Sequence, residues 1–426
     1  MQDRQLAFNI LNKIERDKAY SNLTLDSCLS KNEGEVYSSA FVTALVYGVT
    51  ERLITLDYIL SQYLTKPLKK LKPEVLTALR LGAYQLKFMD SVPDSAAVNE
   101  SVKLVKKNGC AYASGLVNSV LRRVSENEID FSKIDKTDEL LSVKYSCPVS
   151  LVNSFIADYG IEDTEKILEH SLGRPNTFAR VNTLKTNTEE LLERLRQEGI
   201  TAEKADGFEN CIRFDSSFSF DSCKSFSEGL FHVQDLSSAQ CVRLLDVSEG
   251  MTVVDACAAP GGKSFTAAQI MNNKGRIISF DLYESRVKLI DDNARRLGID
   301  IITACAHDSS KTDSSLTECA DRVLCDVPCS CLGTIGRKPE IRYKDLAFID
   351  KLSQLQYNIL LSSSRYLKHG GLLVYSTCSL SKRENEDVAD RFLLNNPEFE
   401  KACEYRTFMP HKDGTDGFFT AGFRRK

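Results

Sequence analysis

A glycine-rich segment in the second half of the chain follows a short apolar run and opens a helical pattern. It reads Asp255-Ala256-Cys257-Ala258-Ala259-Pro260-Gly261-Gly262-Lys263-Ser264. Small residues let a backbone approach a ligand, and the N–H groups that begin a helix favour polar or anionic ligand atoms. A P-loop is disfavoured because Cys257 stands where its first glycine is required. A dinucleotide fingerprint is also disfavoured, because it needs spaced glycines and only the adjacent pair Gly261-Gly262 is present. S-adenosylmethionine, which has no phosphates, is the third interpretation.

Acidic residues stand at the ends of the next predicted strands. Asp281 lies 20 residues after Gly261, where an acidic side chain meets ribose hydroxyls in nucleotide-binding α/β folds. The alternative is a helix cap, since Glu284 follows three residues later; the glycine-rich loop favours ribose. Asp308 and Asp326 follow the next two strands. Together they suit a ligand with ribose hydroxyls, an adenine amine and a sulfonium, although each alone could be a turn residue.

Two cysteines also follow predicted strands. Cys329 stands in Asp326-Val327-Pro328-Cys329-Ser330, and Cys378 in Ser376-Thr377-Cys378-Ser379. Both loops should open onto one sheet edge. A metal site is disfavoured because the pair lacks C-x-x-C spacing and the 5 histidines are scattered. A redox disulfide remains possible, but nothing else resembles thioredoxin. We favour nucleophilic catalysis by a thiolate and expect no metal.

Cytosine gives a chemical reason for such a thiolate. Its C5 is too weakly nucleophilic to take a methyl group unaided. Thiolate addition at C6 makes C5 enamine-like, so that C5 can attack a sulfonium methyl; loss of the C5 proton then allows the thiolate to leave. A single cysteine is more often a small buried apolar residue, but paired loops beside a sulfonium-compatible pocket favour catalysis.

These residues require an α/β sheet to position them. Short apolar runs are predicted strands at Thr252–Ala256, Arg276–Phe280, Ile299–Ala304, Arg322–Cys325 and Gly371–Tyr375. Helical patterns lie between them at 263–271, 284–297 and 350–367. This alternation is typical of an open, mostly parallel sheet, whose ligands bind at the carboxyl ends of strands. We therefore predict an open, Rossmann-like α/β domain over 236–426, and the site residues described above favour an S-adenosylmethionine-dependent methyltransferase.

The remaining sequence differs in pattern. Residues 1–132 show apolar residues at helical spacing throughout and are predicted to be an all-α bundle. Residues 133–235 combine helices near 148–170 and 187–198 with strands at Thr177–Val181 and Cys211–Phe214, which predicts linker helices and a small α+β module. The fold class is thus multidomain.

Composition excludes several classes of protein. The chain has 426 residues, 42% hydrophobic and 27% charged, so it is neither disordered nor collagen-like. No apolar run is long enough to span a membrane, and no signal peptide is visible, so we expect a cytoplasmic protein with free thiols. The net charge is −4, yet residues 1–134 hold 18 basic and 15 acidic residues, a surplus of +3. Local nucleic-acid contacts remain compatible with this balance, and Lys66, Lys69, Lys70 and Lys72 form either an RNA contact or a solvated helix end.

The catalytic motifs resemble the RNA cytosine-5 methyltransferase family of the Fmu/Sun type. The resemblance rests on 255–263, 326–330 and 376–379, supported by Gln234–Ser238, Arg180–Thr183 and Asp416–Phe419. It implies that Cys378 is the nucleophile and that Cys329 helps to release the product. It implies that the residues lining the S-adenosylmethionine site are Cys257, Ala258, Ala259, Pro260, Gly261, Gly262, Lys263, Asp281, Asp308 and Asp326. It also implies an RNA-recognition-like module before the catalytic domain.

The first 130 residues separately resemble the NusB-like helical RNA-binding domain. Ala19–Asn22, Leu79–Gly82 and Val117–Arg123 carry that likeness. A NusB-like front joined to this catalytic domain resembles the bacterial enzymes that act on 16S ribosomal RNA, so the expected partner is that RNA, naked or in an assembling small subunit. We expect a monomer.

Two departures and two alternatives remain. Gly336 stands in Ile335-Gly336-Arg337-Lys338-Pro339, where relatives often show a second arginine. Cys331 stands where the family usually has glycine, which alters backbone freedom beside Cys329 but leaves both proposed catalytic thiols in place. An RNA-binding or antitermination factor with an idle methyltransferase fold is the alternative from another class, but it would need neither thiol. Methylation of transfer RNA or protein would keep the cofactor and change the substrate.

Overall fold

The computed structural model describes residues 2–17, 24–25, 27–29, 38–173, 175–215, 218 and 220–426. Ala19–Asn22, which carries part of the NusB resemblance, lies outside them. The chain forms two compact units, Met1–Gly173 with Ile335–Lys344, and Arg174–Thr334 with Asp345–Lys426. Within the described ranges, no single helix is long and apolar enough to cross a membrane; two bent pairs, Ser39–Glu51 with Leu53–Ser61 and Thr137–Tyr145 with Val149–His170, reach that length and composition only together.

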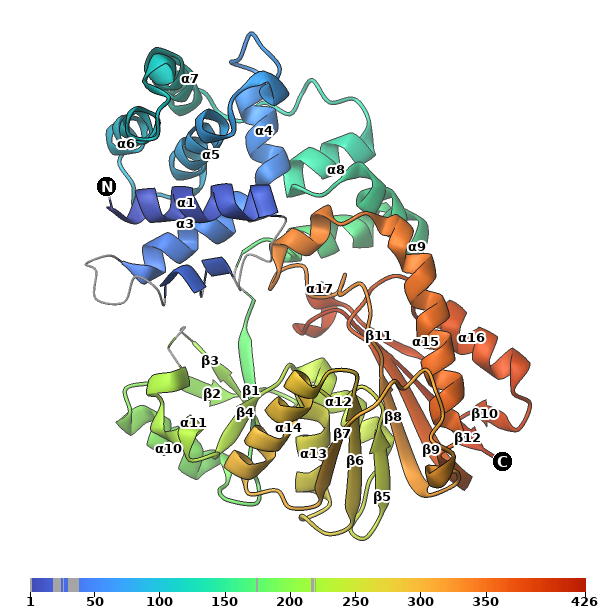
Figure 1. Cartoon of the computed structure of the whole chain (residues 1–426). Coiled ribbons are helices and arrows are strands. Elements are labelled where there is room, and N and C mark those ends of the chain that lie inside the picture. Colours follow the sequence, from blue (N-terminus) through green and yellow to red (C-terminus); the bar gives the residue numbers. More distant parts are fainter. Residues whose placement is uncertain are drawn as a thin grey trace. The chain divides into compact units, whose positions relative to one another are not determined.

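In the first unit the regular elements of the described residues are all helices, as the sequence predicts for 1–132 (Figure 1). Its α-helices are α1 (Gln2–Asp17), α3 (Ser39–Glu51), α4 (Leu53–Ser61), α5 (Pro73–Phe88), α6 (Asp94–Lys107), α7 (Ser114–Glu126), α8 (Thr137–Tyr145) and α9 (Val149–His170). Short 3-10 helices are η1 (Leu68–Lys70), η2 (Ala111–Ala113) and η5 (Pro339–Tyr343). Helix α5 packs against α1, α3, α4, α6 and α7. Close approach requires Gly82, since a Cβ there would lie 2.4 Å from Leu121 and 2.8 Å from Ser101.

A small antiparallel sheet begins the second unit. Its strands β1 (Thr177–Val181), β2 (Ala202–Lys204), β3 (Cys211–Phe214) and β4 (Phe231–Val233) have the order β2-β3-β1-β4. The helices of this segment are α10 (Thr188–Gln197), η3 (Phe220–Ser222) and α11 (Lys224–Ser227). Leu191 and Leu195 of α10 pack with Val181 and Ile212 in its core. The sequence predicts β1 and β3 but misses β2 and β4, which are too short to show a pattern.

The large sheet contains eight strands. Five are parallel: β5 (Thr252–Asp255), β6 (Arg276–Asp281), β7 (Ile302–Ala306), β8 (Ala320–Asp326) and β9 (Leu367–Thr377). Strand β12 (Phe418–Arg425) is antiparallel to β9, and β10 (Phe399–Lys401) and β11 (Arg406–Phe408) are antiparallel to β12. The order is β10-β12-β9-β8-β5-β6-β7. The sequence predicts the five parallel strands within a few residues and misses the three antiparallel ones.

Helices cover both faces of this sheet (Figure 1). One core contains side chains of α12 (Leu236–Leu245), α13 (Gly262–Ile270) and α14 (Glu284–Leu297), and the other those of α15 (Ile349–Ser364) and α16 (Glu386–Asn395). Val253 belongs to the first core and Val254 to the second, because successive strand residues point to opposite faces. Short helices η4 (Ser314–Leu316), η6 (Leu346–Phe348) and α17 (Pro410–Asp413) complete the unit.

The strand order places a switch point at β5. The chain continues from β5 to β6 and β7 on one side, and then returns to β8 and β9 on the other. Ligands of such sheets bind outside the carboxyl ends of the strands at this point. The loops that follow β5 and β8 therefore define where a site is expected.

Candidate active site

The glycine-rich turn after β5 is held between the neighbouring strands. Ala256 N–H donates to the carbonyl of Leu324 at 2.9 Å, and Ala258 N–H donates to that of Phe280 at 2.7 Å. Gly261 then begins α13 with φ of 109°, and a Cβ at this position would lie 2.1 Å from the ring of Phe265. Only glycine accommodates both requirements. The turn thus presents its backbone at the carboxyl edge.

Asp255 supports this turn from beneath. Its carboxylate is buried and accepts a hydrogen bond of 2.6 Å from the hydroxyl of Ser264, which lies 2.9 Å from that of Ser279. Burial raises the pKa of Asp255 to about 7, and the nearby charge of Asp326 acts in the same direction. The residue holds the β5 turn against α13.

Lys263 and Asp326 form an ion pair at the switch point. Lys263 Nζ donates to Asp326 Oδ2 at 2.7 Å, and Ser376 Oγ donates to the other carboxylate oxygen at 2.8 Å. Burial lowers the pKa of Lys263, but the charge and hydrogen bond of Asp326, together with the nearby Cys241 and Asp255, outweigh burial and leave that pKa above its ordinary value. The start of α13 and the carboxyl ends of β8 and β9 therefore meet at one charged pair.

Asp281 lies at the end of β6 with its carboxylate buried. It does not cap the next helix by its side chain, since α14 begins after Tyr283 without a side-chain capping bond. Arg286 lies 3.1 Å from Asp281 Oδ2 and donates to the carbonyl of Ala259 at 2.8 Å. Arg286, which sequence reasoning did not single out, thus joins Asp281 to the glycine-rich turn.

Asp308 is held within its own loop after β7. Its Oδ1 accepts a hydrogen bond of 2.6 Å from the Ser310 hydroxyl, and Lys311 Nζ lies 3.0 Å from Oδ2. These two partners lower the pKa of Asp308. The adjacent Ser309 donates to the carbonyl of Ala256 at 2.5 Å, so this loop is fastened to the β5 turn.

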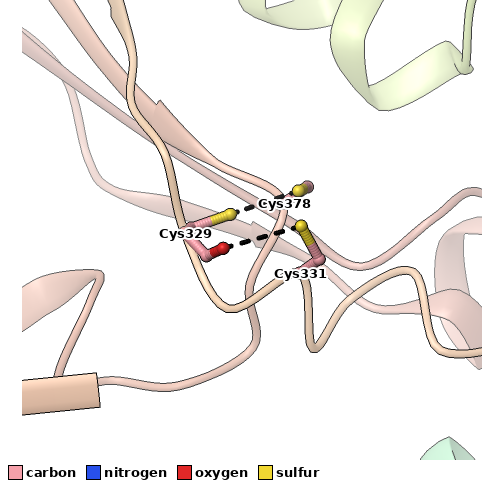
Figure 2. Close-up of side chains that lie close together, drawn as sticks. All are labelled: Cys329, Cys331 and Cys378. Carbon is pink, nitrogen blue, oxygen red and sulfur yellow. Dashed lines mark hydrogen bonds between the residues drawn. The ribbon is translucent and has the colours of Figure 1, made fainter. Parts of the chain in front are cut away.

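The structure brings Cys329 and Cys378 together. Cys329 follows β8 and Cys378 follows β9, and their sulfur atoms lie 3.2 Å apart (Figure 2). A third thiol, Cys331, lies beside them with its Sγ 3.6 Å from the carbonyl oxygen of Cys329. Cys331 has φ of 63°, in the left-handed region that glycine adopts most readily. The backbone at position 331 therefore favours glycine sterically, and glycine is the residue that the family resemblance leads us to expect there.

A buried glutamate fastens the two cysteine loops. Glu384 is fully buried; its Oε1 accepts from the Ser330 N–H at 2.8 Å, and its Oε2 from the hydroxyls of Ser330 at 2.5 Å and Ser379 at 2.6 Å. Gln356 of α15 donates to Oε1 at 3.0 Å and to the carbonyl of Pro328 at 2.9 Å. The residues next to both cysteines therefore share one carboxylate. Sequence reasoning missed Glu384.

The environment of the thiols favours their protonated forms. Hydrogen bonds from Cys331 and Cys378, with burial, raise the pKa of Cys329. The hydrogen bond of Cys329 lowers the pKa of Cys378, but Cys331, burial and the charge of Asp326 outweigh it and raise that pKa. A thiolate at this position would gain stability from a cationic ligand group nearby.

The fold and this site define a Rossmann-like methyltransferase unit. The family model described as 16S rRNA methyltransferase RsmB/F matches residues 242–424. The NusB family model matches residues 1–126, and a model described as the RsmF/B-like ferredoxin-like domain matches residues 147–221. The three parts of the predicted fold class are thereby confirmed.

Curated relatives resemble the chain over nearly its whole length. It is 38% identical to the probable ribosomal RNA small subunit methyltransferase B of Bacillus subtilis, covering 99% of this chain and 98% of the relative. It is 34% identical to the corresponding probable enzyme of Synechocystis, covering 99% of each. The crystal structure of a protein named PH0851 matches with a TM-score of 0.83 and 28% identity, covering 99% of each chain. The chain belongs to the family of ribosomal RNA small subunit methyltransferases B.

Proposed function

We propose that the protein methylates C5 of a specific cytosine in 16S ribosomal RNA, using S-adenosylmethionine and a covalent bond between Cys378 and C6. The observation that carries the proposal is the pair of thiols 3.2 Å apart at the carboxyl ends of β8 and β9. The neighbouring Lys263–Asp326 pair and the β5 turn supply a ligand site at the same edge. The names of the B. subtilis and Synechocystis relatives support a ribosomal substrate.

The two thiols are assigned the roles that the family resemblance implies, and the chemistry of cytosine gives a step to each. The Cys378 thiol loses its proton, its sulfur bonds to C6, and the C5–C6 π electrons move to C5. C5 then takes the methyl group as the methyl–sulfur bond of the sulfonium breaks, which leaves a neutral thioether. A base removes the C5 proton, the electrons restore the C5=C6 bond, and the C6–sulfur bond breaks. Cys329, whose sulfur lies within hydrogen-bonding reach of Cys378, assists this release. Asp326, which pairs with Lys263, is also assigned to orient the target base.

The residues after β5, β6, β7 and β8 fit S-adenosylmethionine, which supplies an electrophilic methyl group on a sulfonium. We assign Cys257–Lys263 as the cradle, because α13 begins at Gly262 without a side-chain capping bond, and a helix N-terminus favours polar or anionic ligand atoms. The buried carboxylate of Asp281 is assigned to the ribose hydroxyls, and Asp308 and Asp326 complete the acidic lining.

Recognition of RNA is assigned to the rest of the chain. We propose that 1–132 and 133–235 bind the RNA and that 236–426 carries the chemistry, in a monomer that acts in the cytoplasm. The target cytosine must be unstacked or single-stranded to reach Cys378. Arg122 and Arg123, exposed on α7, and the lysines around η1 are assigned to phosphates.

The experiment uses the full chain, labelled S-adenosylmethionine and unmodified 16S ribosomal RNA, both naked and in partly assembled small subunits. Wild type should transfer label to cytosine C5. Cys329→Ser should accumulate a protein–RNA adduct that survives denaturation, and Cys378→Ser should give neither label nor adduct. Cys403→Ser, a change at a half-buried cysteine distant in sequence from both loops, serves as the matched control.

Two results would contradict the proposal. Label in transfer RNA and none in 16S ribosomal RNA would reject the substrate. Full activity of Cys378→Ser, or binding of RNA without any transfer by wild type, would reject the covalent mechanism, and the latter would favour an RNA-binding factor.

A further inference from the structure

The third thiol changes what this site can bind. The sulfur atoms of Cys329, Cys331 and Cys378 all lie within 4.8 Å of one another, and Figure 2 shows them pointing toward one another. Cys329 and Cys331 come from one loop, and Cys378 comes from the loop after the adjacent strand. Sequence reasoning disfavoured a metal because no C-x-x-C pair is present; the cluster instead combines a C-x-C pair with a distant cysteine.

The spacing of the sulfurs suits a thiolate-bound metal ion. Zinc–sulfur bonds of about 2.3 Å at tetrahedral angles place two sulfurs roughly 3.8 Å apart. The Cys329–Cys378 separation of 3.2 Å and the limit of 4.8 Å bracket that value. Small side-chain rotations would therefore place the three sulfurs around one ion, leaving a fourth position for water.

The left-handed backbone at Cys331 strengthens the argument. A non-glycine residue with φ of 63° is uncommon and costs conformational energy. This chain nevertheless carries a side chain there, and its sulfur lies within 4.8 Å of the sulfurs of Cys329 and Cys378. Glycine at this position would leave only two thiols at the site, whereas Cys331 completes a set of three.

We propose that Cys329, Cys331 and Cys378 form a site for a soft divalent metal ion, zinc or cadmium, and that its occupation blocks the methyltransferase reaction. Each thiol releases its proton to solvent as its sulfur binds the ion, so that one ion replaces three protons. The bound ion occupies the sulfur of Cys378, which can then not attack C6. This inhibition rests on the proposed function; the binding itself does not.

Binding is tested on the reduced, metal-free full chain, with cadmium as the spectroscopic probe and zinc in competition with a chromophoric chelator. Wild type should bind one tight equivalent, with the ultraviolet charge-transfer absorption of cadmium thiolates. Cys331→Gly, which also relieves the positive φ, should lose about 100-fold or more in affinity. Cys403→Ser should bind as wild type does, because that thiol lies outside the cluster.

Equal affinity in wild type and Cys331→Gly, or no tight equivalent in wild type, would overturn the site. Circular dichroism checks folding, and Cys331→Asn, which tolerates the left-handed region, replaces glycine if that variant unfolds. Inhibition is measured as the zinc concentration that halves the rate of each enzyme relative to its own metal-free rate. Higher zinc tolerance of Cys331→Gly is expected; metal binding with unchanged tolerance would reject the inhibitory role while leaving the proposed methyltransferase function intact.

Discussion

Glu384 illustrates how one residue can hold two loops that each carry a proposed catalytic thiol. Its carboxylate accepts hydrogen bonds from residues adjacent to both Cys329 and Cys378. In Glu384→Gln one oxygen becomes an NH2 group that must face hydroxyl or N–H donors. We expect the thiols to shift and kcat to fall about 100-fold, since a misplacement near 1 Å has that effect. Steady-state kinetics, with the Kd of S-adenosylmethionine measured separately, checks this.

The Kd should change little, because Glu384 contacts the cysteine loops rather than the β5 turn. Glu404→Gln, at an exposed glutamate paired with Lys401, is the control and should keep wild-type kinetics. An unchanged kcat in Glu384→Gln would show that the two loops hold their positions without this carboxylate.

Asp255 predicts a pH dependence of stability. Its pKa is about 7 in the folded protein against 3.8 in the unfolded chain, so the folded state binds the proton more tightly. The stabilisation of the folded state by the protonated Asp255 carboxyl is therefore complete below pH 4 and is lost as the pH rises through 7. Asp255→Asn, which can still accept from Ser264, should weaken this dependence. Urea unfolding followed by circular dichroism at pH 5 and 8 measures it, since the chain has no tryptophan.

The expected sign is a smaller loss of unfolding free energy between pH 5 and 8 in Asp255→Asn than in wild type. Asp246→Asn, at an exposed aspartate after α12, is the control and should retain the wild-type difference. Identical pH profiles for Asp255→Asn and wild type would mean that the Asp255 carboxylate ionises in the folded protein without penalty.

At the scale of elements, the sequence predicts those helices and strands whose residue pattern is visible over a short stretch of chain. The five parallel strands are visible because each is short, apolar and separated from the next by a helical pattern. Strand β12 is buried on both faces over most of its length, so it shows no alternation. Glu384 stands among several charged residues, and nothing local separates it from Glu386. Its role depends on three segments that only the fold assembles.

The segment Ile335–Lys344 also has a role that depends on contacts between residues distant in sequence. It follows the Cys329 loop in sequence yet belongs to the helical unit. Within that unit the fully buried Arg342 donates to the carbonyls of Glu51 at 3.2 Å, Tyr145 at 3.2 Å and Ser171 at 3.0 Å. No motif marks Arg342, because its partners are distant in sequence. The guanidinium fastens η5 to α3, α8 and the end of α9.

Arg342→Ala should therefore destabilise the helical unit. Three buried carbonyls would lose their donor, and the Glu51 carboxylate, whose pKa burial already raises, would lose the opposing charge of Arg342. We expect a cost of about 3 kcal/mol. Amide hydrogen exchange in peptides from α3 and α8 should accelerate about 100-fold. Tyr343→Phe, which removes only the hydroxyl near Ser146, should cost about 1 kcal/mol.

At the scale of the whole molecule, charge is unevenly divided along the chain. The net charge is −4, but residues 1–134 carry a surplus of +3. Lys66, Lys69, Lys70 and Lys72 are exposed around η1. Arg123 lies 5.8 Å from the ring of Tyr63, and Lys72 Nζ lies 5.6 Å from the ring of Tyr112, which is 70% exposed. Cations beside exposed aromatic rings can contact both phosphates and unpaired bases.

The triple variant Lys66→Ala, Lys69→Ala, Lys70→Ala should weaken binding of 16S ribosomal RNA and reduce the slope of log affinity against log salt by about 2, since each phosphate contact contributes roughly 0.7–0.9. Filter binding from low to moderate salt measures the slope.

A matched triple variant, Lys133→Ala, Lys136→Ala, Lys166→Ala, removes equal charge from exposed lysines that already pair with acidic residues. If the two triple variants show equal slopes of log affinity against log salt, the weaker RNA binding is due to net charge alone. A change confined to the first triple would place the RNA backbone at η1, and kcat at saturating RNA should then stay near wild type because these lysines lie far in sequence from both thiols.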